Sequence, residues 1–391
     1  MLQQIFKNTH DAVDRVPAFV LKSRIASGRG DHAGAFAILK DCLGQLGLSV
    51  PDTTWEDCDR KFHGLATKVQ AADHAALFNR PLSDCRILTM RGAVLCDAIA
   101  AAFWSEPLLF YQLTLLEVEL NLNHNPVTQA GLAYLHLAGV AIGRFDMVDF
   151  ACEQADLAQE LLRKYQHDAY TYGRGQTIYC ILVGHLQQPA NALEYALSTA
   201  VERSLSAGDS MMALLAVGYT ANVKIWTSED LVDVENFCSY GAEEIHKWQE
   251  DTRGASFIEG VKQYARALQG KTRLDDPDHI LSDLESNTHG YVEHPRYQLE
   301  RRDSTMTVYQ YYKILTLYTF GYYQEAAELA ERVLPHLWQF WSARFVLAIP
   351  FCHSLARFAL LRESPGLSEA EEAEVVADAK KLRQRFEAWS M

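Results

Sequence analysis

Residues of the types that perform covalent catalysis are present, but their spacing does not bring them together. Cys352 and His353 form the clearest pair of a nucleophile and a base in the chain. Adjacent residues on a helix point about 100° apart, whereas a nucleophile and its base must meet at hydrogen-bond distance. This pair therefore does not predict a catalytic site.

Phosphate-binding sequences are incomplete. Gly270–Thr272 has the letters that end a phosphate-binding loop, but Ala265 occupies the position of the first glycine of that motif. Gly173 and Gly175 lack the preceding strand that a dinucleotide-binding turn requires. The protein-kinase HRD and DFG sets are also missing from the sequence. We expect no nucleotide cofactor and no catalytic turnover of ATP.

Two further short patterns have ordinary explanations. His289, Glu293 and His294 contain metal-ligating atoms, but their spacing fits no established ligand motif, and we expect no metal. Arg29–Asp31 spells a tripeptide known from cell adhesion, and here it falls at a turn between two helical segments. We interpret it as turn chemistry.

An acidic stripe is the strongest candidate for a binding surface. It consists of Asp146, Asp149, Glu153, Asp156 and Glu160, spaced three and four residues apart. This spacing places the carboxylates on one helix face, away from the apolar residues of the same segment. Such a stripe is most often a solvated face. The alternative is a docking face for a basic partner, whose attraction salt would weaken.

The elements that must position these residues are helical hairpins, and residues 308–337 show this most clearly. Tyr311, Leu315 and Tyr318 lie three and four residues apart and share one face of a helix. Gly321 supplies a turn. The return helix carries its own apolar face, made of Ala326, Ala330, Val333 and Leu337.

Related turns occur elsewhere. The pattern glycine, any residue, aromatic, any two residues, small residue aligns approximately on four turn glycines: Gly30, Gly143, Gly184 and Gly321. This pattern is typical of tetratricopeptide-type units, whose period is about 34 residues. The spacing of the copies varies, so the array is degenerate. The sequence predicts an all-α fold, an α-α superhelix of tetratricopeptide-like hairpins.

The polar, proline-containing segment after Gly270 divides this array. We expect a helical array over residues 1–270, a polar connector over 271–300, and further hairpins of the same array over 301–391. A solenoid normally ends in an atypical polar unit. The last helix is cut off near Trp389 without one, so the chain is expected to be a piece of a longer protein.

Composition limits the classes of partner. The chain has 391 residues, 49% of them hydrophobic, and a net charge of −14. That charge argues against binding to nucleic acid or an anionic membrane surface. We expect no membrane span, because no apolar run approaches the roughly 20 residues that cross a bilayer, and the first residues lack the apolar core of a signal peptide. The eight cysteines include no CxxC pair, so reduced thiols in the cytoplasm are expected.

Four segments carry a resemblance to a known family. They are SGRGDHAGAFAILKDCLGQLGL, EPLLFYQLTLLEVELNLNHN, VERSLSAGDSMMALLAVGYTANVKIW and the run from YYKILTLYTFGYYQ to FCHSLARFALL. They resemble the helical region that follows the AAA-type ATPase module in large fungal and bacterial hybrid proteins. Those proteins also contain a serine/threonine-kinase-like domain and a sensor histidine kinase. This chain lacks both flanking catalytic parts.

The resemblance implies a non-catalytic interaction segment that relays signals between an ATPase and a histidine kinase in a two-component system. Its partner would be a protein or peptide, including those flanking domains. Two alternatives remain open: a tetratricopeptide-like regulator linked to transcription, and an enzyme with a site in the groove of the solenoid. The first needs a DNA-binding element elsewhere. The second needs paired carboxylates or a histidine-centred cluster, and the sequence shows no convincing one.

Overall fold

The predicted all-α fold is confirmed. The computed structural model describes residues 6, 8–9, 11–29, 31–103, 105–247, 253–282, 304–363 and 369–389. Within these residues 81% are helical and there is no strand. Helices that follow one another in sequence pack side by side, which makes the protein a helical superhelix.

The helices vary in length, and a π-helical and a 3-10 segment interrupt them. In chain order they are α2 (Ala12–Gly28), α3 (His32–Gln45), α4 (Trp55–Ala71), α5 (His74–Asn79), α6 (Arg86–Phe103), α7 (Pro107–Asn123), α8 (Ala130–Phe145), α9 (Val148–Lys164), α10 (Ala169–Tyr179), the π-helix η1 (Cys180–Gly184), α11 (His185–Gln187), α12 (Ala190–Ser206), α13 (Ser210–Thr227), α14 (Leu231–Lys247), α15 (Arg253–Leu268), α18 (Ser304–Thr319), α19 (Tyr323–Val333), the 3-10 helix η2 (Leu334–Phe340), α20 (Phe345–Glu363) and α21 (Glu369–Trp389).

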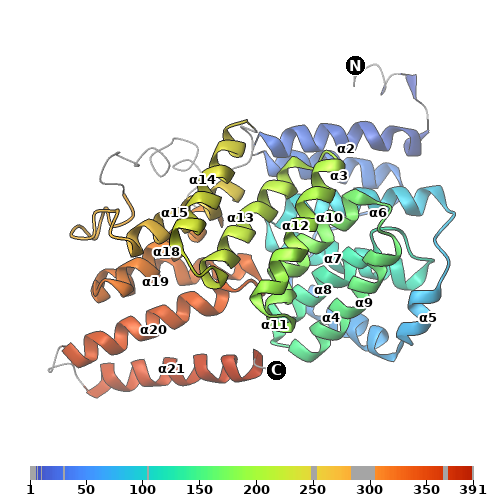
Figure 1. Cartoon of the computed structure of the whole chain (residues 1–391). Coiled ribbons are helices and arrows are strands. Elements are labelled where there is room, and N and C mark those ends of the chain that lie inside the picture. Colours follow the sequence, from blue (N-terminus) through green and yellow to red (C-terminus); the bar gives the residue numbers. More distant parts are fainter. Residues whose placement is uncertain are drawn as a thin grey trace.

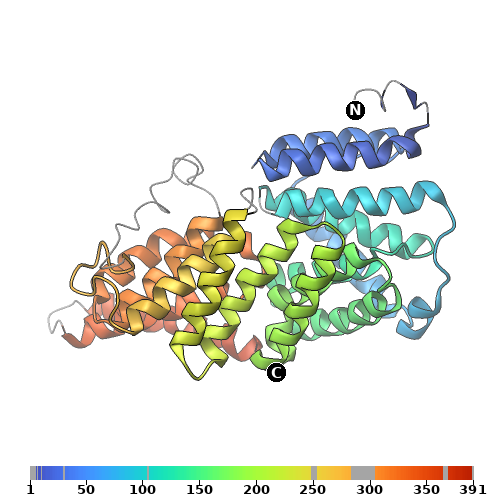
Figure 2. The ribbon, with the colours of Figure 1, turned by 45° about the horizontal axis from the view of Figure 1, so that its top comes forward.

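Antiparallel hairpins follow one another through the molecule (Figure 1). The hairpin of α2 and α3 forms a layer that packs on α6, as Figure 2 shows from above. In the other half, α13, α15 and α18 lie next to one another, and α19, α20 and α21 continue the stack. A single core of buried apolar side chains extends from Val13 to Trp389.

The turn predicted at Gly321 is confirmed. Its φ is +86°, and the amide of Tyr322 donates to the carbonyl of Leu317 at 2.9 Å. The amide of Gly321 donates to the carbonyl of Tyr318, which completes the pattern of a Schellman motif. The return helix α19 buries Ala326 and Ala330 completely, as their spacing predicts.

Two of the other three turn predictions are wrong, and the third falls on a residue that the structure does not describe. Gly143 lies within α8, and the left-handed residue that ends this helix is Asp146, with φ of 51°. Gly184 has helical dihedral angles at the end of η1. Gly30 lies outside the described residues. Positive-φ glycines instead end α3, α12 and α15, at Gly47, Gly208 and Gly270.

Part of the polar connector is packed. Residues 271–282 form turns in which Ile280 and Leu281 are buried, and the hydroxyl of Tyr322 donates to the carbonyl of Leu274. The rest of the connector, from residue 283, lies outside the described residues.

One helix corrects the expectation about apolar runs. By length and composition α20 is able to cross a membrane, and it is the one such helix among the described residues. Core helices of globular proteins meet the same criterion. In this structure α20 packs against α18, α19 and α21 and contains Pro350.

The superhelix returns on itself at Trp341, which follows η2. This indole is 4% exposed and lies 5.1 Å from the ring of Phe110 and 6.4 Å from that of Trp55. Its backbone has φ of 52° and ψ of −101°, an unusual conformation for a residue with a side chain. A Cβ placed on Gly143 would lie 2.8 Å from the Trp341 Cα, so the two backbones meet where α8 has no side chain.

Replacing Gly321 with valine should destabilise the protein by about 1–2 kcal/mol, because a β-branched residue is strained at positive φ. No atom outside its immediate neighbours lies within 4 Å of the position a Cβ would take, so backbone strain is the only cost. Asparagine, which tolerates this conformation, should cost less. Thermal or denaturant unfolding measures both variants. Equal midpoints for wild type and Gly321→Val would contradict the assigned turn.

Gly143→Ala should destabilise the protein by about 1–3 kcal/mol, the usual range for overpacking, because its methyl group would overlap the Trp341 backbone. Gly64→Ala in α4 is the matched control, since its Cβ would meet nothing within 4 Å. The control variant should be more stable than wild type by about 0.5–1 kcal/mol, because alanine has a higher helix propensity than glycine. Chemical denaturation of both variants makes the comparison, and a stabilised Gly143→Ala would refute the close approach.

Candidate functional site

An apolar groove of about 700 Å³ is the candidate functional site. It lies between α11, α13, α18, α20 and α21, and its lining is mostly aliphatic and aromatic. Three large apolar side chains at the groove remain substantially exposed: Trp226, Phe351 and Phe386. Pockets of this size and character are typical of binding sites, and exposed apolar surface of this kind marks interaction surfaces.

Part of this lining could be predicted. Tyr311, Leu315 and Tyr318 share one face of α18, as their spacing indicates, and all three line the groove. The opposite wall comes from α20, through residues such as Leu347 and Phe351. No sequence signal joins these walls to α11 and α13, because that contact depends on how the superhelix curves.

Arg344 is the one permanently charged residue of the described lining. Its guanidinium lies 5.1 Å from the centre of the Trp226 ring, in the geometry of a cation–π contact. Within the described part of the chain it forms no ion pair with a carboxylate. Burial, and then the charge of Arg344, lower the pKa of His185 to about 4, against an opposing effect of the Cys180 backbone. His185 is therefore neutral at pH 7.

Irregular backbone precedes both of these residues. His185 follows directly on η1, and π-helical segments occur frequently at functional sites. Arg344 lies three residues after Trp341, whose positive φ is sparsely populated for residues with a side chain. The groove thus takes its arginine and its histidine from the least regular segments in its walls.

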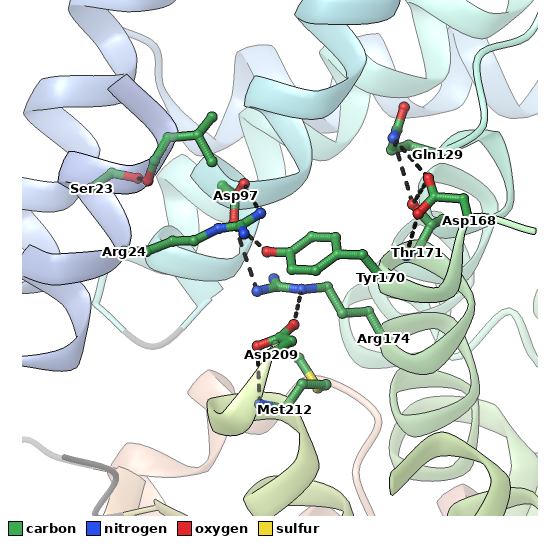
Figure 3. A network of polar contacts seen from close by, with 11 residues as sticks. Ser23, Arg24, Asp97, Gln129, Asp168, Tyr170, Thr171, Arg174, Asp209 and Met212 are labelled. Atoms are coloured by element: carbon green, nitrogen blue, oxygen red, sulfur yellow. Dashed lines mark hydrogen bonds and ion pairs between the residues drawn. The ribbon is translucent and has the colours of Figure 1, made fainter. Parts of the chain in front are cut away.

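A second polar cluster lies away from the groove, where α2, α6, α10 and the start of α13 meet (Figure 3). Arg24 donates to Asp97 from Nε at 3.3 Å and from Nη2 at 3.1 Å. Tyr170 donates its hydroxyl to Asp97 at 2.5 Å, and Arg174 donates Nε to Asp209 at 2.7 Å. The ring of Tyr170 lies 4.1 Å from the Arg24 guanidinium and 4.4 Å from that of Arg174.

This cluster is balanced in charge, with two arginines and two aspartates. Burial lowers the pKa of Arg174, but Asp209, Tyr170 and Asp97 outweigh that effect and raise it well above its usual value. A small cavity of about 130 Å³ adjoins the cluster. Because each charge already has a partner inside the protein, we interpret the cluster as a structural clamp across four helices.

The acidic stripe is divided between two surroundings. Asp149, Glu153, Asp156 and Glu160 are exposed along α9, and Gln187 donates to Asp156 at 3.0 Å. Asp146 instead accepts hydrogen bonds from Arg385 at 3.0 Å and from the Trp389 indole at 2.8 Å. Asp146 therefore anchors α21, and partner binding by the rest of the stripe stays a prediction.

In the structure the surroundings of Cys352 do not favour the thiolate that a nucleophile requires. Burial raises the pKa of its thiol to about 12, which keeps it in the neutral form. The ring of His353 contacts Glu331 instead, with Nε2 3.4 Å from Oε1. Cys352 is one of seven buried cysteines, and Cys85 is exposed.

The phosphate-like glycine patterns are also structural. Gly270 ends α15, and Lys271 forms an ion pair with Glu235 at 2.7 Å. A phosphate loop would instead lead into a helix N-terminus. Gly173 and Gly175 lie inside α10, where a Cβ on either would overlap Ser204 or Leu162, so they allow close packing of helices.

No metal-binding group of three or more histidine, cysteine or acidic residues occurs in the part of the chain that the structure describes. His289, Glu293 and His294 lie outside it. A scan against protein-family models finds no matching family, and a search of curated proteins finds no match.

Arg174→Met should destabilise the protein by about 3–5 kcal/mol, because it leaves Asp209 buried without its ion-pair partner. The Arg174 side chain is only 3% exposed. Arg24→Met is the matched control: its side chain is 42% exposed, and the loss should be about 1 kcal/mol or less. Urea denaturation at neutral pH measures both. Similar losses of unfolding free energy in the two variants would show that burial does not determine how much each arginine contributes to stability.

Proposed function

We propose that this chain is a non-catalytic protein-interaction scaffold, whose groove binds a helical segment of a partner protein. The observation that carries the proposal is the groove itself, with its apolar lining and exposed Trp226, Phe351 and Phe386. Amphipathic helices bind such grooves through apolar side chains spaced three, four and seven residues apart. Helical arrays commonly use their concave surfaces in this way.

The proposed setting is signal transduction. Its support is the resemblance of the four quoted segments to the helical region between an ATPase module and a sensor histidine kinase in fungal and bacterial hybrid proteins. In that setting the partner is a neighbouring domain or a component of the same two-component pathway. The exposed carboxylates of α9 supply a second surface, and a basic partner would be attracted to it.

A displayed library tests the groove directly. It contains helical peptides of about four turns, with all surface positions randomised, and it is selected on the purified full chain. We expect enriched peptides to share large apolar residues at helical spacing. The loss of one aromatic anchor typically costs 2 kcal/mol or more. Phe351→Ala should therefore weaken binding by about tenfold or more.

Tyr195→Ala is the matched control, because Tyr195 is an exposed aromatic residue on α12 that does not line the groove. Its binding should stay close to that of wild type. Two results would refute the proposal. One is a selection that enriches no shared apolar pattern, and the other is a set of binders that lose as much affinity with Tyr195→Ala as with Phe351→Ala.

A further inference from the structure

Arg344 carries a charge that no carboxylate of the described chain balances. It is half-buried on the wall of an apolar groove, and its guanidinium carbon lies 5.1 Å from the centre of the Trp226 ring. This cation–π contact stabilises the charge in part, but a partly buried ion keeps a desolvation cost that an ionic partner can compensate. Within the described chain, however, no acidic residue lines this groove or lies at ion-pair distance from Arg344.

Two arginines that are more deeply buried or lie close to several charges have carboxylate partners within the chain. Arg174, which is nearly fully buried, faces both Asp97 and Asp209. Arg266, also largely buried, pairs with Glu235. The chain carries a net charge of −14, so carboxylates are plentiful. The lining of the groove is therefore positively charged, whereas the protein as a whole is negatively charged.

The positive charge of Arg344 acts on the histidine of the groove, His185. Arg344 contributes to keeping the His185 ring neutral, so His185 adds no second cation. Both ring nitrogens of His185 are buried in this wall. In such surroundings a charge acts over a longer distance than it does at an open surface.

We propose that Arg344 is a specificity determinant that reads an aspartate or glutamate on the helical segment bound in the groove; this inference rests on the proposed function. The guanidinium lies over the Trp226 ring and forms no ion pair with a carboxylate of the described chain, so its N–H groups can donate to a carboxylate of the bound segment. The carboxylate supplies the compensation that the protein itself lacks. Such a pair sets selectivity more than total affinity, because both ions are desolvated on binding.

The expected partner segment is therefore an amphipathic helix with one acidic residue within its apolar face. Apolar side chains contact Phe351, Phe386 and the tyrosines of α18, and the acidic residue lies opposite Arg344. A segment with several acidic residues would be repelled by the net negative charge of the protein. A single carboxylate opposite Arg344 pairs with the guanidinium and adds little repulsion.

Parallel peptide selections test this inference. The library described above is selected on wild type, Arg344→Gln and Arg344→Glu. Wild type should enrich aspartate or glutamate at one fixed position relative to the apolar pattern. Arg344→Gln should enrich the same apolar pattern without that acidic preference. Arg344→Glu should enrich lysine or arginine at the same position, since a reversed charge selects a reversed partner.

Direct binding measurements then quantify the effect. The best wild-type peptide is synthesised with its selected glutamate or with glutamine. Wild type should bind the glutamate form on the order of tenfold more tightly, whereas Arg344→Gln should bind the two forms equally. Arg362→Gln is the matched control, because Arg362 is an exposed arginine on α20 that does not line the groove. It should keep the tenfold preference.

The outcomes separate the two proposals. Enriched apolar peptides without an acidic preference on wild type would overturn the role of Arg344 and leave the scaffold function intact. An acidic preference that survives in Arg344→Gln would overturn it as well. A selection that finds no groove-binding peptide would refute both. Melting curves of Arg344→Gln that match wild type would show that any lost preference reflects recognition and not unfolding.

Discussion

The contact of Trp341 with α8 brings together parts of the superhelix that lie about 200 residues apart in the sequence. Helical hairpins stacked in sequence bury their faces only against neighbours, so an open array has no reason to bring residue 341 near residue 143. Here the indole enters an aromatic cluster with Trp55, Phe110 and Tyr111. The backbone passes so close to Gly143 that only glycine fits. The positive φ of Trp341 is a strain that this packing compensates.

This contact also determines the shape of the groove. Arg344 and the start of α20 follow Trp341 within a few residues, so fixing the indole fixes where the α20 wall begins. At the other end, Asp146 holds Arg385 and Trp389 of α21. Asp146 itself ends α8, the helix that contains Gly143. One short stretch of the first half therefore positions two walls of a groove built largely from the second half.

The sequence predicts local features well and distant ones poorly. Periodicity identifies the α18 face of Tyr311, Leu315 and Tyr318, and the turn at Gly321 follows from the need for positive φ. The turn pattern gives the wrong result at Gly143, because the sequence does not distinguish a glycine needed for close packing from a glycine needed for a turn. Nothing local marks η1, or relates His185, Trp226 and Arg344, since their proximity comes from curvature accumulated over many helices. The groove and the clamp of Arg24, Asp97 and Arg174 were therefore beyond sequence reasoning.

The buried Arg174 and the half-buried Arg344 show how the charge of an arginine can be balanced in different ways in one molecule. Arg174 is surrounded by carboxylates and an aromatic ring from its own chain, and its hydrogen bonds are directed across helices that must stay together. Removing such a partner leaves an uncompensated charge, so the network favours one arrangement of the helices. Arg344 shares the aromatic contact but lacks the carboxylates within the described chain. In the free protein solvent and the Trp226 ring stabilise the charge of Arg344, and in our proposal the carboxylate of the bound segment adds a direct ionic partner. The same residue type therefore acts as a clamp where the fold provides its counter-ion, and as a recognition element where the fold does not.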